Sequence, residues 1–84
     1  WGLSALLHGD VQFENGEVKL SNFHQHAVLR MDETPEIEVH LVNNDAEEPW
    51  GVGELGAPVI VPAVLNAIFA ATGKRIRQLP VKLV

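Results

Sequence analysis

Residues 49–72 read Pro-Trp-Gly-Val-Gly-Glu-Leu-Gly-Ala-Pro-Val-Ile-Val-Pro-Ala-Val-Leu-Asn-Ala-Ile-Phe-Ala-Ala-Thr, a glycine-rich loop followed by an apolar segment. In the apolar segment the hydrophobic side chains occupy every direction of a helical wheel, and Asn66 is the only polar residue before Thr72. A helix that is apolar on all sides is typical of a protein interior. The stretch therefore predicts a buried helix that follows a glycine-rich loop.

Proline and glycine set the expected ends of this helix. Pro62 fits only the first helical turn, because a proline deeper in a helix costs about 3 kcal/mol. Gly73 suits the position after the last turn, where the backbone often becomes left-handed. We therefore expect the helix to run from about residue 60 to residue 72.

The composition is that of a small, acidic and apolar chain. Its 84 residues carry a formal net charge of −5, include no cysteine and are 46% hydrophobic. The acidic balance argues against nucleic-acid binding, which needs clustered Lys and Arg, and the lack of cysteine excludes disulfides and thiolate metal sites. The apolar run at 57–71 is shorter than the roughly 20 residues of a transmembrane helix. We expect no transmembrane segment, and the residues shown include no recognisable signal peptide.

The segments before the loop complete an α+β pattern. Residues 2–8 read as the end of a helix stopped by Gly9, and Asn15-Gly16 between two alternating runs predicts a β-hairpin. Residues 21–34 show no period and are expected to form an irregular connector, whereas residues 36–42 alternate strictly and predict a further strand. The expected fold is a hairpin and a further strand packed with the buried helix. So short a chain cannot cover that helix, so residues 1–84 are expected to be one segment of a larger domain.

Glu54 is the only ionisable residue of the glycine-rich loop. The glycines on either side, Gly51, Gly53 and Gly56, are expected to allow left-handed backbone conformations and the close approach of another molecule. A carboxylate beside apolar walls at the start of a helix can serve as a base. The plainer interpretation is an acid that the helix dipole favours by about 0.3 to 1 kcal/mol. From the residues alone, the plainer interpretation is preferred.

Other patterns offer less support for a specific chemistry. The glycine spacing matches neither the P-loop nor the dinucleotide fingerprint. His24 and His26 could share one face of an extended segment, but no third ligand stands at a diagnostic spacing, so no metal site is expected. Ser4 and Ser21 lack a nucleophile motif, which argues against a hydrolase. Trp50 is expected to anchor the loop by packing rather than to line a substrate funnel.

A series of short motifs extends over nearly the whole chain in register. They are Gly2-Leu3-Ser4-Ala5, the hairpin at Asn15-Gly16, Ser21-Asn22-Phe23-His24, Val28-Leu29-Arg30-Met31, Pro35-Glu36-Ile37-Glu38-Val39-His40, Gly51-Val52-Gly53-Glu54 and Asn66-Ala67-Ile68-Phe69-Ala70-Ala71-Thr72-Gly73-Lys74-Arg75-Ile76-Arg77. In this order they resemble the C-terminal part of the large, molybdopterin-binding subunit of the xanthine dehydrogenase and aldehyde oxidase family of molybdenum hydroxylases. The nearest branch resembles the bacterial isoquinoline 1-oxidoreductase beta subunit and related membrane-associated aldehyde dehydrogenases.

The resemblance implies a role for the glycine-rich loop. In that family the glutamate of the Gly-x-Gly-Glu loop is the active-site base, and by position it corresponds to Glu54. Glu54 would then take a proton from a molybdenum-bound hydroxide, whose oxygen attacks an aldehyde or N-heteroaromatic carbon. Gly51, Val52 and Gly53 would lie near the molybdenum centre. The resemblance thus reverses the preference for the plainer interpretation of Glu54. Leu55 departs from the family pattern, in which proline is common, and this would loosen the hold on the glutamate.

The resemblance also implies a cofactor and partners. The complete oxidoreductase would hold a molybdenum-molybdopterin cofactor, in bacteria the cytosine dinucleotide form, through segments outside these residues. The 84 residues alone are therefore expected to bind no cofactor and to be inactive. The implied partners are the remainder of the large subunit, an iron-sulfur small subunit and a small aldehyde or N-heteroaromatic substrate. The compartment, bacterial cytoplasm or periplasm, stays open.

A rival interpretation makes the chain a non-enzymatic α+β protein-interaction module. Such a module would dock on another protein through the predicted strand at 36–42 or through the apolar helix. A long reading frame upstream of Trp1 would favour the enzyme, and an immediate start codon would favour the module.

Overall fold

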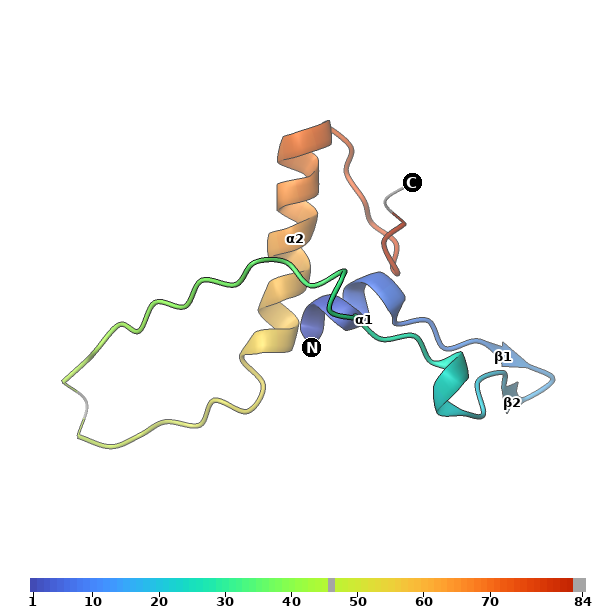
Figure 1. The fold of residues 1–84 in the computed structure, drawn as a ribbon, viewed down its shortest axis with the longest axis horizontal. Coiled ribbons are helices and arrows are strands. Elements are labelled where there is room, and N and C mark those ends of the chain that lie inside the picture. Colours follow the sequence, from blue (N-terminus) through green and yellow to red (C-terminus); the bar gives the residue numbers. More distant parts are fainter. Residues whose placement is uncertain (46, 83–84) are drawn as a thin grey trace.

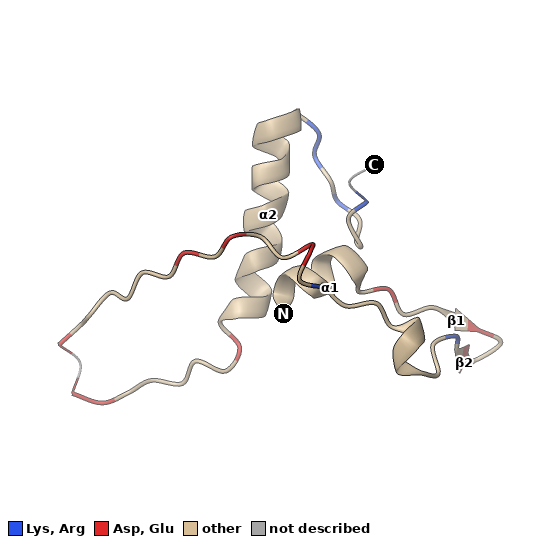
Figure 2. Cartoon of the chain, in the orientation of Figure 1, with Lys and Arg blue, Asp and Glu red and all other residues tan. Residues whose placement is uncertain are grey.

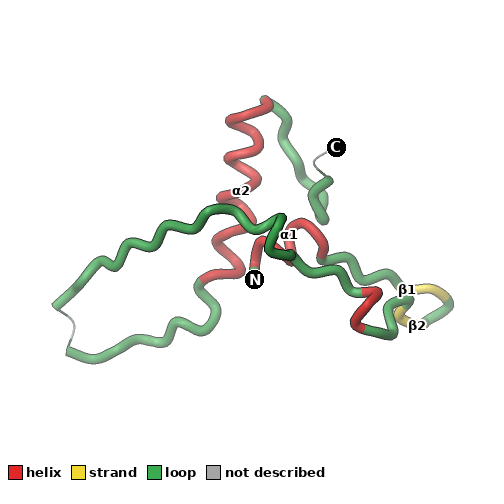
Figure 3. The backbone as a smooth tube through the Cα atoms, viewed as in Figure 1, coloured by secondary structure: helices red, strands yellow, loops and turns green. Residues whose placement is uncertain are grey.

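The computed structural model describes residues 1–45 and 47–82, in which two helices cross and a small hairpin projects from them (Figure 1). The elements are α1 at Gly2–His8, β1 at Phe13–Glu14, β2 at Glu17–Val18, a 3-10 helix at Phe23–Gln25 and α2 at Gly56–Thr72. Loops connect all of them. The longest forms a wide arc, residues 38–45 and 47–52, on the side of α2 opposite the hairpin (Figure 3). The predicted α+β class is confirmed.

The small core lies where the chain end returns to α1. Leu6 is 1% exposed and Val81 is 4% exposed. The amide of Val81 donates a hydrogen bond to the carbonyl of Leu6, with an N···O distance of 2.9 Å. The predicted helix at residues 2–8 is confirmed, and Gly9 follows it as expected, although with a φ of −72° rather than a left-handed value.

The hairpin follows the Asn-Gly prediction. Phe13 lies opposite Val18 and Glu14 opposite Glu17 in an antiparallel pair. The turn residues Asn15 and Gly16 have φ values of 52° and 82°. A two-residue type I′ turn needs positive φ at both central positions, and asparagine and glycine adopt such values at little cost.

The helix α2 begins earlier than the prolines predicted. It starts at Gly56 instead of about residue 60, so Pro58 occupies the first turn and Pro62 lies in the second. The prediction for Pro62 was wrong, because the helix continues past this proline. The N–H that Pro62 lacks would have bonded to the carbonyl of Pro58. Gly73 ends the helix at a φ of 72°, as predicted.

No residue of α2 is buried by the described residues of the chain. Val59 is 61% exposed, and Asn66, its one polar residue before Thr72, accepts a 2.7 Å hydrogen bond from the Arg75 guanidinium. This exposure agrees with the expectation that so short a chain cannot cover the helix, and the burial of α2 in a larger domain stays a prediction. The radius of gyration, 16.6 Å, exceeds the roughly 12 Å of a compact domain of this length.

The further strand is also absent from the described residues. Residues 36–42 belong to no helix or sheet, and Leu41 is 95% exposed. The predicted strand is wrong for these residues, because a strand needs a neighbour for its N–H and C=O groups and the arc runs away from the rest of the chain (Figure 1).

Charge is divided along the chain. Between Asp32 and Glu54, along the connector and the arc, the chain carries several Asp and Glu residues and no Lys or Arg. The basic residues Lys74, Arg75 and Arg77 come after α2 (Figure 2). Within the described ranges, no helix has the length and apolar character that a membrane crossing requires.

Candidate active site

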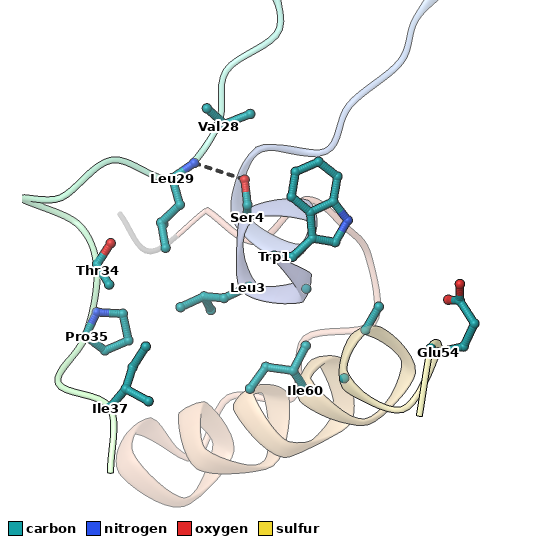
Figure 4. A pocket seen from close by; sticks show the side chains of 14 residues that line it. Trp1, Leu3, Ser4, Val28, Leu29, Thr34, Pro35, Ile37, Glu54 and Ile60 are labelled. Atoms are coloured by element: carbon teal, nitrogen blue, oxygen red, sulfur yellow. Dashed lines mark hydrogen bonds between the residues drawn. The ribbon is translucent and has the colours of Figure 1, made fainter. Parts of the chain in front are cut away.

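Glu54 lies in the turn directly before α2. Leu55 forms the N-cap with helical backbone angles and offers no capping side chain. The Glu54 side chain is exposed and stands at the rim of a hollow of about 870 Å³. In Figure 4 this hollow lies between α1, the first turns of α2 and the segment from Val28 to Ile37.

The walls of the hollow are mainly apolar. They include Trp1, Leu3, Val28, Leu29, Ile37 and Ile60. Glu54 is the only ionisable side chain among the lining residues, and the structure shows no hydrogen bond or ion pair to its carboxylate from the described residues. The predicted setting, a carboxylate next to apolar walls at a helix start, is therefore present, but its side chain is exposed rather than held against those walls.

The glycines of the loop are not left-handed. Among the described glycines only Gly16 and Gly73 have positive φ, so the expectation of left-handed backbone at Gly51, Gly53 and Gly56 was wrong. A Cβ atom added to any of these three would meet nothing within 4 Å. Nothing within the described chain therefore requires glycine there. The close approach of another molecule, the second part of the expectation, stays a prediction.

Trp50 does not anchor the loop in this chain. It is 84% exposed, so the packing role that we expected for it is wrong among the described residues. Trp1 instead lines the hollow that Glu54 borders (Figure 4). No sequence pattern singled out Trp1, because one aromatic residue ahead of a short helix carries no periodic signal.

The four histidines all precede Glu54 in the sequence by 14 residues or more. His8 Nε2 lies 3.0 Å from a Glu33 carboxylate oxygen, and His40 pairs with Glu38 at the same distance. His24 belongs to the 3-10 helix, and His26 follows it. Across residues 1–45 and 47–82, no group of three or more His, Cys, Asp or Glu is arranged to hold a metal ion.

Two contacts that position the walls of the hollow were not predicted from the sequence. The amide of Leu29 donates a 2.9 Å hydrogen bond to Ser4 Oγ, which ties the wall of the hollow to α1. On the other side of α1, a Cβ atom on Gly2 would collide with Cγ2 of Ile60 and lie 3.0 Å from Cα of Ala57. Gly2 is the first residue of α1, where the cost of glycine in a helix interior does not apply, so the sequence carried no signal of this contact.

Three curated relatives match nearly the whole chain. The isoquinoline 1-oxidoreductase beta subunit of Brevundimonas diminuta is 43% identical over 81 residues, 96% of this chain. The membrane-bound aldehyde dehydrogenase of Gluconacetobacter polyoxogenes, whose name includes pyrroloquinoline quinone, is 39% identical over 98% of it. A nicotinate dehydrogenase subunit of Pseudomonas putida is 36% identical over 93%. The chain belongs to the molybdenum hydroxylase family.

The chain is short beside these members of the molybdenum hydroxylase family. It spans 10% of the first two relatives and 7% of the third. No family model matches the chain. No solved structure matches it either. Family membership therefore rests on the relatives, and the geometry of the site rests on the structure described above.

Proposed function

We propose that residues 1–84 are the C-terminal segment of the large, molybdopterin-binding subunit of a molybdenum hydroxylase. The complete enzyme oxidises a small aldehyde or N-heteroaromatic compound by adding oxygen from water to a carbon atom. The observation that carries this proposal is the match of 93–98% of the chain to relatives named for the oxidation of an aldehyde, isoquinoline and nicotinate. Those names also favour the enzyme over the interaction module.

Glu54 is the proposed general base. Its carboxylate accepts the proton that the attacking oxygen loses as the new C–O bond forms. Two observations support this role: the carboxylate has no partner among the described residues, and it borders a largely apolar hollow. A base must reach the proton that it removes, and a carboxylate already paired with a cation would be a weaker base.

The described residues fit the wall of a cofactor site better than a set of metal ligands. They supply one carboxylate and, at Gly51, Val52 and Gly53, an exposed loop with open space at both glycines. The molybdenum cofactor, in our proposal the cytosine dinucleotide form, supplies the acceptor for the two electrons taken from the substrate carbon. An iron-sulfur small subunit receives these electrons. The segments that grip the cofactor lie in the remainder of the large subunit.

The first test replaces Glu54 in the complete enzyme. Glu54→Gln keeps the shape of the side chain and removes its basicity, so kcat should fall by at least about 100-fold. The molybdenum content, measured by elemental analysis, should stay unchanged. Near-normal turnover at full molybdenum occupancy would refute the assignment. An active enzyme that holds pyrroloquinoline quinone and no molybdenum would refute the proposed cofactor.

Matched controls lie in the acidic stretch before the loop. Glu47→Gln and Glu48→Gln remove the same charge from exposed side chains. Surface substitutions of this kind usually change stability by less than about 0.5 kcal/mol, and we expect turnover close to that of the unaltered enzyme. A loss as large as that of Glu54→Gln would mean that the acidic charge of the region matters, rather than one base.

A further inference from the structure

We propose that Gly2 is a positioning residue for Glu54. It lets α1 approach the first turns of α2 closely enough to fix where the loop before α2 delivers its carboxylate. The proposal rests on the proposed role of Glu54 as the base. It adds a residue far away in the sequence that acts through the packing of two helices and does not touch the substrate.

The contact between the helices depends on the missing side chain of Gly2. Gly2 is buried, and an added Cβ would collide with Cγ2 of Ile60 and lie 3.0 Å from Cα of Ala57. Ala57 is the second residue of α2 and Ile60 the fifth. Glu54 precedes Ala57 by three residues, so a shift of the helix start at this contact would move the Glu54 backbone with it.

α1 can serve as a fixed reference because other segments hold it. Ser4 Oγ accepts a hydrogen bond from the Leu29 amide, the Leu6 carbonyl accepts one from the Val81 amide, and His8 pairs with Glu33. These three contacts join α1 to the segment from Leu29 to Glu33 and to the chain end. None of them involves α2.

The start of α2, in contrast, has few supports. Its N-cap makes no side-chain hydrogen bond, and α1 is the only helix or strand that packs against α2 in the part of the chain that the structure describes. The contact at Gly2 is therefore the main restraint that these residues place on the loop of Glu54. A displacement of about 1 Å at a reacting group can cost about 100-fold in rate.

Gly2→Ala distinguishes this role from a simple effect on helix stability. Alanine favours a helix at least as much as glycine does, so the substitution should not destabilise α1 if Gly2 had no role beyond the helix. If Gly2 sets the approach of α2, the added methyl group pushes α2 away. In the complete enzyme we then expect kcat to fall about 10- to 100-fold, since the base moves with the start of α2.

A second substitution should reverse the effect. Ile60→Leu removes the Cγ2 methyl group that would meet the new Cβ and keeps the side-chain volume. The double variant Gly2→Ala with Ile60→Leu should recover most of the lost kcat. Hydrogen exchange supplies a readout apart from activity: amides at residues 56–62 should exchange faster in Gly2→Ala and return toward the original rate in the double variant.

Leu6→Val is the matched control on the same helix. It trims a buried side chain of α1 and leaves Gly2 and Ile60 unchanged. We expect faster exchange of the α1 amides and a loss of kcat that is smaller than in Gly2→Ala and that Ile60→Leu does not reverse. If Gly2→Ala accumulates too little protein, Ile60→Ala tests the same contact from the other helix and should lower kcat by about 3-fold or more.

Glu54→Gln, measured in parallel, separates the two proposals. An inactive Glu54→Gln enzyme together with full kcat in Gly2→Ala would overturn the role of Gly2 and leave the base in place. A loss of kcat in Gly2→Ala that Ile60→Leu does not reverse would also overturn it. An active Glu54→Gln enzyme would instead overturn the proposed function itself.

Discussion

The helix α1 and the arc at residues 38–52 differ in how much of their structure the 84 residues determine. α1 is only seven residues long, yet it contacts α2, the segment after the hairpin and the chain end. The arc is longer and leaves Val39, Leu41 and Trp50 exposed. A short segment with several neighbours is fixed locally, whereas a long apolar segment without them depends on protein that lies outside these residues.

The isolated chain should show the largest effect of this difference. The exposed apolar residues of the arc and of α2 exceed what soluble monomers usually tolerate, a few hundred Å² in one patch. We expect the 84 residues expressed alone to be oligomeric or poorly soluble by size-exclusion chromatography. A sharp monomeric peak with cooperative thermal unfolding would contradict this and would favour the interaction module.

The second-largest effect should come from truncating Leu6, the buried leucine of α1. Leu6→Ala removes most of a side chain that is only 1% exposed and should destabilise this region by about 2–5 kcal/mol. Hydrogen exchange of the α1 amides in the complete protein measures the loss. Leu3→Ala, on a half-buried neighbour in the same helix, should cost less. Equal losses would mean that α1 is not held mainly through Leu6.

The tie between α1 and the wall of the hollow should be the weakest of these contacts. Ser4→Ala leaves the Leu29 amide without its acceptor and should cost about 0.5–1.5 kcal/mol. The measurement is again hydrogen exchange, now at Leu29. Ser21→Ala, at an exposed position, is the control and should leave that amide unchanged. Unaltered protection of Leu29 in Ser4→Ala would show that this bond does not hold the wall.

The sequence predicted the elements whose signals are local. Asn15-Gly16 is sufficient for a hairpin turn, and Gly73 is sufficient to end a helix, because each depends on the backbone preferences of one or two residues. Pro62 misplaced the start of α2, since the helix continues past a proline in its second turn at the loss of one backbone hydrogen bond. The alternation at residues 36–42 predicted a strand, but no sequence pattern can provide the neighbouring strand.

The candidate site likewise has one part that the sequence predicted and one part that only the structure shows. Glu54 was found by its chemical type and by resemblance, and the structure adds its exposure and the hollow that it borders. Gly2 and Ser4 were missed as site residues, because their contacts join segments that are distant in the chain. Contacts of this kind follow from the packing of α1 and carry no pattern in the sequence.

A crystal structure of the complete enzyme with its cofactor tests the central claim most directly. We predict that α1 keeps its contact with Ile60 through Gly2, that the arc gains neighbours from the rest of the large subunit, and that the Glu54 carboxylate faces the cofactor within hydrogen-bond reach of the reacting oxygen, roughly 2.6–3.2 Å. A Glu54 carboxylate turned to solvent, with the cofactor beyond the reach of its side chain, would contradict the assignment of the base.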